Sequence, residues 1–412
     1  MAHVRLVLVL VSCALALAAP ARAQSDSQPP QATSRAAEEA ERQQQKAREV
    51  HPYTPGFFER YVLNLEKTGG FLGAIRPFSA VFGGIKPASG LALGPASGYI
   101  FDDGSWVQAK AELSIRRYKL LQMMYQARPL AGGRLIVNGR ARWQDAPEVP
   151  VFPLGPNSPM ASAEYVERKT ELSGQALAQP VSFVRLAGGI GVERYRATSG
   201  DPDLLEDESL GREPALPGLG TRPTFLHSYA LGALDWRDGP GYSRSGTRVE
   251  GVLHDFRDRD GGGYSFRRFD GIAEQFIPIL HGNNVFELSA RLWTTKADSG
   301  STVPFFLMPN LGGSRMLRGF RTFRFRDNDA MVLTGTYRWY IQEYLDGEIF
   351  CETGKVASRV GDLDLTNLQK SYGIGLVVHT PLTTVLKVEV ARGREGTRLI
   401  IGFMPPPLQE IR

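Results

Sequence analysis

The sequence predicts an all-β transmembrane barrel of about sixteen antiparallel strands, and three observations lead to this fold class. From residue 78 onward, short segments alternate apolar and polar side chains, as strands between lipid and a wet interior do. Turn residues separate these segments, and the chain is rich in glycine and aromatic residues, with 45 Gly, 21 Phe and 14 Tyr. After the first 23 residues, no apolar run reaches the roughly 20 residues that a membrane-spanning helix needs.

The stretch 385–391 shows the alternation clearly. Leu386, Val388 and Val390 fall on one face, and Lys387 and Glu389 fall on the other. A membrane barrel with a polar lumen requires this pattern, but a soluble β-sandwich with its polar face outward shows the same one. Alternation alone therefore leaves both folds open.

The lengths of the connections separate the two folds. We expect sixteen strands at 78–85, 89–101, 106–117, 119–129, 133–144, 162–176, 180–194, 225–237, 246–257, 264–278, 284–295, 329–341, 347–355, 371–379, 384–392 and 396–403. The long connections (145–161, 195–224, 296–328 and 356–370) all follow odd-numbered strands, and the connections after even-numbered strands are brief. Long loops on one rim and short turns on the other are typical of outer-membrane barrels, whereas a sandwich has no reason to sort its loops.

A barrel in lipid must also close. Unpaired backbone amides in hydrocarbon cost several kcal/mol each, so an open sheet edge is not tolerated there. We therefore expect the last strand, near 397–403, to pair with the first.

The N-terminus predicts export. Arg5 is followed by the apolar run 6–19 and then by Ala21-Arg22-Ala23, which fits a signal peptide that covers residues 1–23. The alternative is a lipoprotein cleavage box at 10–13, which would make Cys13 a lipidated N-terminus. An exported chain with this strand pattern is expected in a bacterial outer membrane.

The rest of the chain divides into three parts. Residues 24–77 are polar and rich in Gln, Ala and Glu, which predicts a disordered periplasmic linker with a short helix near 57–65. Residues 78–403 form the expected barrel, and 404–412 form a C-terminal tail.

Composition and motifs favour no enzyme and no nucleic-acid partner. The chain has 48 Lys and Arg against 43 Asp and Glu, which gives no concentrated basic field for nucleic acid. Phosphate-loop and nucleophile-elbow motifs are absent, and the histidines are scattered. Two cysteines supply neither a disulfide framework nor a four-ligand zinc site. The stretch 255–263 weakly resembles a calcium loop, but its interleaved Arg257 and Arg259 favour a hairpin tip, so we expect no cofactor and no metal.

The connection at 311–327 is too apolar to lie in water. Its large apolar residues are Leu311, Met316, Leu317, Phe320, Phe323 and Phe325. We expect this loop to fold back into the lumen, where Arg318 would need an anionic partner because an unpaired buried charge is costly. Glu352 is the candidate partner, because it shares the predicted lumen face with Phe350 and Gly354. Cys351 would then face lipid.

Four short motifs resemble those of the BamA/TamA outer-membrane assembly superfamily, also called the surface antigen family. Leu317-Arg-Gly-Phe320 resembles the signature of that family's sixth surface loop. Residues 350–354 are similar to its Phe-x-Asp-x-Gly strand motif, with Glu352 in place of Asp. Residues 337–339 are similar to its Tyr-Arg strand motif, and 152–158 resemble a third-loop element with altered residues. The resemblance covers about 78–403.

The resemblance implies a loop lock inside the barrel. Arg318 would bind Glu352, Gly319 would allow close backbone approach, Phe320 would pack, and Arg338 would belong to the same set. It also implies a role in assembly or insertion of proteins, or in lipid movement, at the outer membrane. The expected partners are outer-membrane lipids and client outer-membrane proteins, or a separate periplasmic partner.

Two readings of function stay open. The stretch 24–77 is too short for the client-docking POTRA modules of the family, so we expect a POTRA-less member. The Gly-rich stretch 83–98 and the prolines at 405–407 favour a poorly joined seam, as an insertase requires. In the alternative, the protein is a passive pore or a structural surface-antigen barrel, and the folded loop only plugs the lumen.

Overall fold

The computed structural model describes residues 75, 77–160, 162–200, 216–239, 241–380 and 383–403. The predicted signal peptide, nearly all of the linker at 24–77 and the tail at 404–412 lie outside the described residues. Within the described ranges, no helix is long and apolar enough to cross a membrane.

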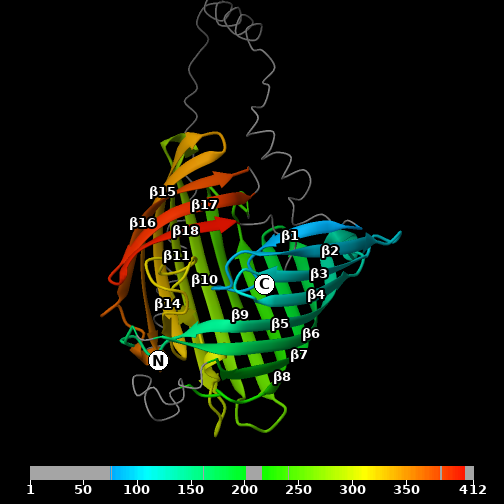
Figure 1. Ribbon diagram of the computed structural model, residues 1–412. Helices are drawn as coiled ribbons and strands as arrows, with labels where there is room; N and C mark the ends of the chain where they lie inside the picture. The colour runs from blue at the N-terminus through cyan, green and yellow to red at the C-terminus, as the bar shows by residue number, and fades with distance from the viewer. Residues whose placement is uncertain are drawn as a thin grey trace, which may run out of the picture.

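Sixteen strands form one antiparallel sheet in chain order, which confirms the predicted all-β fold. They are β1 (Ser79–Gly83), β2 (Ala92–Ile100), β3 (Trp106–Ser114), β4 (Lys119–Gln126), β5 (Leu135–Val151), β6 (Ala163–Val181), β7 (Val184–Ser199), β8 (Thr224–Asp235), β9 (Gly246–Asp258), β10 (Phe266–Ile279), β11 (Asn284–Ala297), β14 (Asp329–Gln342), β15 (Leu345–Ala357), β16 (Gln369–His379), β17 (Thr384–Gly393) and β18 (Gly396–Phe403). Figure 1 shows the sheet curling, so that its last strands (orange and red) approach its first strands (blue). Two short strands, β12 (Asn310–Leu311) and β13 (Phe325–Arg326), pair separately in the connection before β14.

The ladders join each strand of this sheet to its neighbour along the chain. Among the described residues, the ladders run from β1 to β18, and none joins β18 back to β1. Closure of the ring by that last pairing therefore stays a prediction. β1 is joined to β2 by only five residue pairs.

Strand β5 extends furthest beyond the end that its sequence indicated. β5 reaches Val151 although it contains Pro147 and Pro150, which read as a loop. The ladder with β6 shifts register between Ala146 and Val149, so Pro147 lies in a bulge and breaks no required hydrogen bond.

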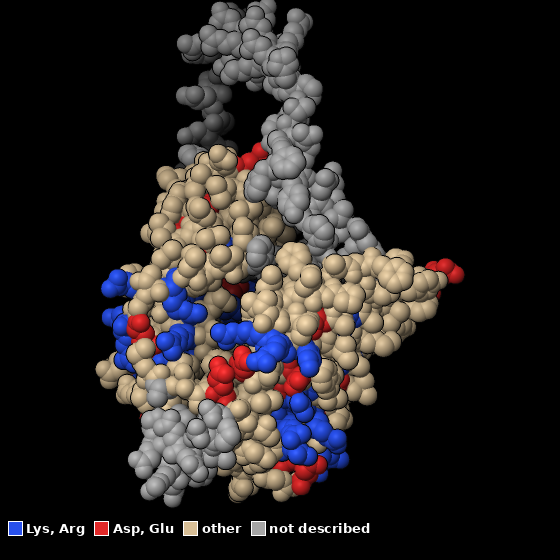
Figure 2. All heavy atoms as spheres, viewed as in Figure 1, with Lys and Arg blue, Asp and Glu red and all other residues tan. Residues whose placement is uncertain are grey.

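The alternation sorts side chains between a wall surface and an interior. On β4, Leu121, Met123 and Tyr125 are exposed, whereas Leu120 and Met124 are buried. Cys351 is exposed on the outer face, as predicted. Broad areas of the strand surface carry no charge, as Figure 2 shows in tan.

The connections follow the predicted segregation with one clear correction. The longest ones, 200–223 and 298–328, leave the same rim as 152–162 and 358–368. The prediction that every connection on the opposite rim is brief is wrong for 236–245. That connection turns inward, and its Tyr242 and Ser243 are buried. Met331 of β14 is buried, because Val360, Leu363 and Leu368 of the 358–368 connection pack against it.

Aromatic side chains fill the interior near the long-loop rim. The inward-facing aromatic residues of the wall there are Tyr165, Tyr195, Phe225, Phe256 and Phe266. They pack against Phe305, Met308 and Phe323 of the 298–328 connection, which therefore crosses from one wall toward the other. A packed plug thus occupies this half of the barrel.

Candidate functional site

The 298–328 connection, which we call the inner loop, is folded around the small β12–β13 hairpin. Leu311, Leu317, Phe320 and Phe325 of this loop are almost fully buried. They pack against side chains of β14 and β15. The apolar residues therefore sit inside the barrel, where the sequence placed them, and burial of such side chains stabilises the inserted loop.

Arg318 projects from the inner loop into a set of carboxylates. Its backbone N–H donates to Glu352 Oε2 at 2.6 Å, and its Nε donates to Glu352 Oε1 at 2.9 Å. Its Nη1 donates to Glu389 Oε1 at 2.5 Å and lies 3.7 Å from Glu348 Oε1. The guanidinium carbon sits 3.3 Å from the centroid of the Phe350 ring. One side chain of the loop thus ties β15 to β17.

The inner loop brings the second of two cations to three carboxylates at this site. The side chains of Glu348, Glu352 and Glu389 are 0%, 1% and 2% exposed. Lys387 Nζ lies 3.1 Å from Glu348 and 3.9 Å from Glu389. Without Arg318, three buried carboxylates would share a single lysine, which is a costly arrangement in a dry interior.

Sequence reasoning found only one of the three carboxylates. Glu348 and Glu352 are four residues apart on β15, so they face the same side of the sheet. This spacing could have identified Glu348 as a second partner of Arg318. Glu389 lies two strands away, on the polar face of the alternation seen at 385–391. Its meeting with Arg318 depends on the register of β15, β16 and β17.

Gly319 and Phe320 complete the lock. The Gly319 N–H donates to Ser371 Oγ at 2.7 Å. A Cβ atom on Gly319 would lie 2.4 Å from the Gly393 nitrogen, so only glycine permits this approach of the loop to β17. Phe320 is fully buried and meets Phe325 edge-on, with ring centroids 5.1 Å apart.

A second anchor of the inner loop was not predicted. Arg324 Nε donates to Glu395 in the β17–β18 turn at 2.7 Å. Its Nη1 and Nη2 donate to Ser158 Oγ and to the Ser158 carbonyl, at 2.6 and 2.7 Å. The Gly155 N–H also donates to the Arg326 carbonyl at 2.8 Å. The 152–158 element therefore holds the inner loop, although its sequence gave no sign of which residue it would meet.

Arg338 lies outside the lock, which corrects the expectation that it belongs with Arg318. Its Nη2 donates to the Ser243 carbonyl, and its guanidinium carbon lies 4.6 Å from the Tyr242 ring centroid. Tyr242 stacks on His379 at 3.7 Å and donates its hydroxyl to Asp346. Arg338 thus holds the 236–245 connection inside the opposite end of the barrel.

The structure offers no metal centre in its described part. There, no group of three or more His, Cys, Asp or Glu side chains is placed to hold a metal ion. In the stretch 255–263, Asp258 accepts hydrogen bonds from the backbone N–H groups of Asp260 and Tyr264, as a hairpin tip does.

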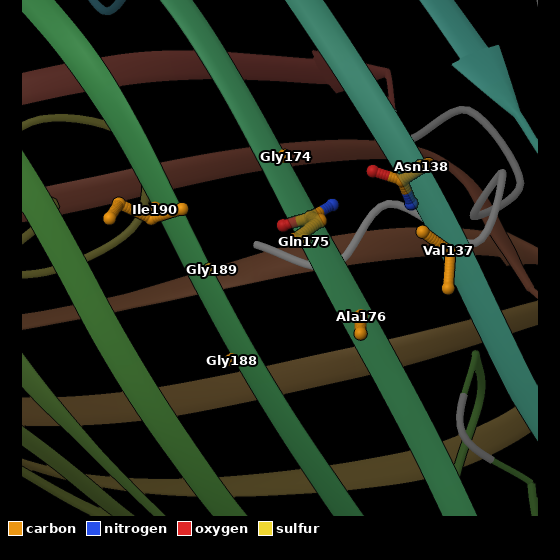
Figure 3. Close-up of a pocket in the computed structure, with 8 residues that line it drawn as sticks. All are labelled: Val137, Asn138, Gly174, Gln175, Ala176, Gly188, Gly189 and Ile190. Carbon is orange, nitrogen blue, oxygen red and sulfur yellow. The ribbon is translucent and has the colours of Figure 1, made fainter.

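A shallow hollow of about 440 Å³ lies on β5, β6 and β7. Figure 3 shows that glycines thin the wall there, with Gly174, Gly188 and Gly189 beside the polar Asn138 and Gln175. None of its lining residues is charged, and none belongs to the lock. The hollow therefore adds nothing to the candidate site.

Comparison with known proteins agrees with the sixteen-stranded antiparallel fold. The family model described as the Omp85 superfamily domain matches residues 164–393. No curated protein matches the chain. The structure of BamA from Haemophilus ducreyi lacking POTRA domains 1–3 is 14% identical, with a TM-score of 0.59, and the match covers 79% of this chain and 69% of that one.

Two CdiB structures are more distant. CdiB from Acinetobacter baumannii is 10% identical with a TM-score of 0.46, and CdiB from Escherichia coli is 9% identical with a TM-score of 0.49. Each match covers 80% of this chain but only 57% and 60% of the respective CdiB chain. At such identities the likeness to BamA shows the fold alone.

Replacing Arg318 with alanine should destabilise the barrel by about 3–5 kcal/mol, because it leaves three buried carboxylates with one cation. Glu352→Gln should act in the same direction, since it removes the negative charge and one of the two oxygens that accept from Arg318. Urea unfolding in detergent and heat-modified migration on a gel would measure the loss. Arg315→Ala, an exposed change in the same loop, is the matched control. Unaltered unfolding and an equally protected loop in both lock variants would contradict this role.

Gly319→Ala should prevent the inner loop from seating, because the new Cβ would overlap the backbone of β17. Limited proteolysis should then cut within 311–327, while Ser314→Ala leaves the loop protected. A protected loop in the Gly319 variant would mean that β17 can move aside.

Arg338→Ala should release the 236–245 connection without opening the lock. Trypsin should then cleave after Arg244, while the inner loop remains resistant. Simultaneous cleavage of both segments would show that the two ends of the lumen are coupled, contrary to the contacts described above.

Proposed function

This chain belongs to the Omp85 superfamily, and from that membership we propose that it aids the insertion of proteins, or the movement of lipids, at a bacterial outer membrane. The gate would be the seam between β1 and β18. Export by the signal peptide at 1–23 is part of this proposal, and so is the absence of catalytic activity. A separate periplasmic chain would deliver the client.

The observation that supports the proposal is the unequal length of the strands in the sheet. β1 has five residues, whereas β5, β6 and β7 have 17, 19 and 16. A ladder made by β1 offers few backbone hydrogen bonds, so parting it costs less than parting any long pair. In lipid, a client strand could replace those bonds directly, because unpaired backbone groups there demand partners.

The inner loop supports the far side of this seam. Arg318 holds β15 and β17 together, and Gly319 packs on Gly393 at the end of β17. Arg324 reaches Glu395 in the turn that leads into β18. The C-terminal side of the seam is therefore braced from within.

The filled lumen counts against the passive-pore alternative. The aromatic cluster and the inner loop occupy the half of the barrel near the long-loop rim. A steady aqueous channel would require a polar, open bore through that half. A gated seam, by contrast, works with a plugged lumen.

Locking the seam should abolish activity. Cysteines placed in β1 and β18, in a Cys351→Ser chain, would be oxidised, and the outer-membrane proteome would be measured after depletion of the native protein. We expect loss of other barrels only in the oxidised seam variant. A disulfide between positions 253 and 269, which face each other on β9 and β10, is the matched control.

Two results would contradict the proposal. One is a normal proteome with the seam fully cross-linked. The other is a steady conductance in planar bilayers that rises when residues 311–327 are deleted, which would favour the passive pore.

A further inference from the structure

A set of outward-facing basic residues surrounds part of the wall at its long-loop end. We call it the basic belt, and its members are Lys119, Arg168, Arg194, Arg196, Arg222, Arg257, Arg267 and Lys296. They come from the long-loop ends of β4 and β6 to β11, or lie next to those ends. On the same face, Asp145, Asp255 and Asp298 pair with members of the belt, and the exposed Glu164 lies four residues before Arg168 on β6. Positive charge is therefore in clear excess on this surface.

Strand register places several members side by side. Lys119, Asp145, Arg168 and Arg196 are successive partners across β4, β5, β6 and β7. The Tyr195 N–H donates to the Pro223 carbonyl, and the Ala197 N–H donates to the Thr221 carbonyl. Position 222 therefore lies opposite position 196, so that a second arginine follows the first in the same row.

Three of these arginines have no ion-pair partner within the part of the chain that the structure describes. Among the described residues, no carboxylate forms an ion pair with Arg194, Arg196 or Arg222. Arg194 only donates to the Thr224 hydroxyl, at 3.3 Å. Like charges that face each other across a ladder are destabilising. The arrangement thus calls for an anion from outside the described part of the protein.

The paired members also keep free surface. Arg257 and Arg267 share Asp255, at 2.8 and 3.3 Å, and their side chains remain 44% and 66% exposed. Arg168 pairs with Asp145 at 2.8 Å and remains 50% exposed. Each guanidinium can therefore bind a further oxygen anion.

The belt lies where the apolar wall ends. Immediately beyond it, toward the short-turn rim, the outward residues include Leu172, Ile190, Val192 and Leu253, all exposed. Figure 2 shows blue side chains, with red ones among them, in the middle and lower right of the view, and a broad tan surface above them. If the tan surface contacts acyl chains, the belt lies at the depth of the lipid headgroups.

We propose that the basic belt binds the phosphate groups of the anionic glycolipid of the outer leaflet, lipopolysaccharide. This rests on the outer-membrane location within the proposed function. Guanidinium groups suit phosphate because they donate paired hydrogen bonds to its oxygens. Bound phosphates would relieve the repulsion between Arg196 and Arg222 and fix the barrel in the bilayer.

A segment of the chain itself offers a competing counter-charge. Residues 201–215, which lie outside the described residues, contain six acids: Asp201, Asp203, Glu206, Asp207, Glu208 and Glu213. This segment lies between β7 and β8, however, whereas the belt extends from β4 to β11.

The test uses the purified, folded full chain in detergent with fluorescent lipopolysaccharide. The belt variant is Arg196→Gln with Arg222→Gln, and the matched control is Arg128→Gln with Arg134→Gln, two exposed residues on the opposite rim. We expect the belt variant to bind about thirtyfold more weakly, since each of the two basic residues near an anionic surface contributes about 1 kcal/mol and about 1.4 kcal/mol is a factor of ten. Heat-modified gel migration would verify that each variant is folded.

Further arms identify the source of the anion. We expect dephosphorylated lipopolysaccharide to bind weakly and inorganic phosphate at the same concentration not to displace the lipid. A variant with the six acids of 201–215 replaced by amides should bind at least as tightly as the native chain.

Equal binding by the belt variant and the native chain would overturn the proposal, as would equal binding of dephosphorylated lipid. Failure of the proposed function would give a different result. The outer-membrane proteome would stay normal with a cross-linked seam, whereas lipopolysaccharide binding would be unchanged.

Discussion

The burial of one guanidinium among three carboxylates is the interaction on which the interior depends. Glu348, Glu352 and Glu389 are almost fully removed from water, and Lys387 alone cannot neutralise them. Such a cluster is tolerable only when its charges are paired and its hydrogen bonds are made. Arg318 adds a second cation and donates three hydrogen bonds to Glu352 and Glu389, so the strands require the loop as much as the loop requires the strands.

The other contacts of the interior follow from that insertion. Once Arg318 is seated, Phe320 and Phe325 are buried, and Phe305 and Phe323 meet the aromatic wall of β6 to β10. Arg324 and the 152–158 element fix the loop at its outer end. The inner loop thus contacts the wall on several sides of the bore, and the shortest strand of the sheet is β1, where we propose the gate.

The same two-residue period that organises the interior also organises the outside. The strands present apolar residues outward over most of their length. Seven of the strands from β4 to β11 also have an outward basic residue near their long-loop end or directly beside it. Hydrocarbon selects the first kind of residue, because buried apolar area is favourable there. Charged headgroups select the second, because guanidinium groups in water-poor surroundings need anions.

Local periodicity and connection lengths determined the sixteen strands. The apolar residues at 311–327, which are close together in the chain, determined the inward path of the inner loop. The position of Glu352 on a single polar face of its strand made it the predicted partner of Arg318. The tertiary structure alone decided that Glu389 completes the lock, that Arg324 meets Ser158, and that Arg338 holds Ser243 at the other end of the lumen. These contacts depend on the register of many strands around a curved wall and on which side chains then face one another across the bore. A shift of one residue in any ladder would change those partners. No segment of the sequence carries that information by itself.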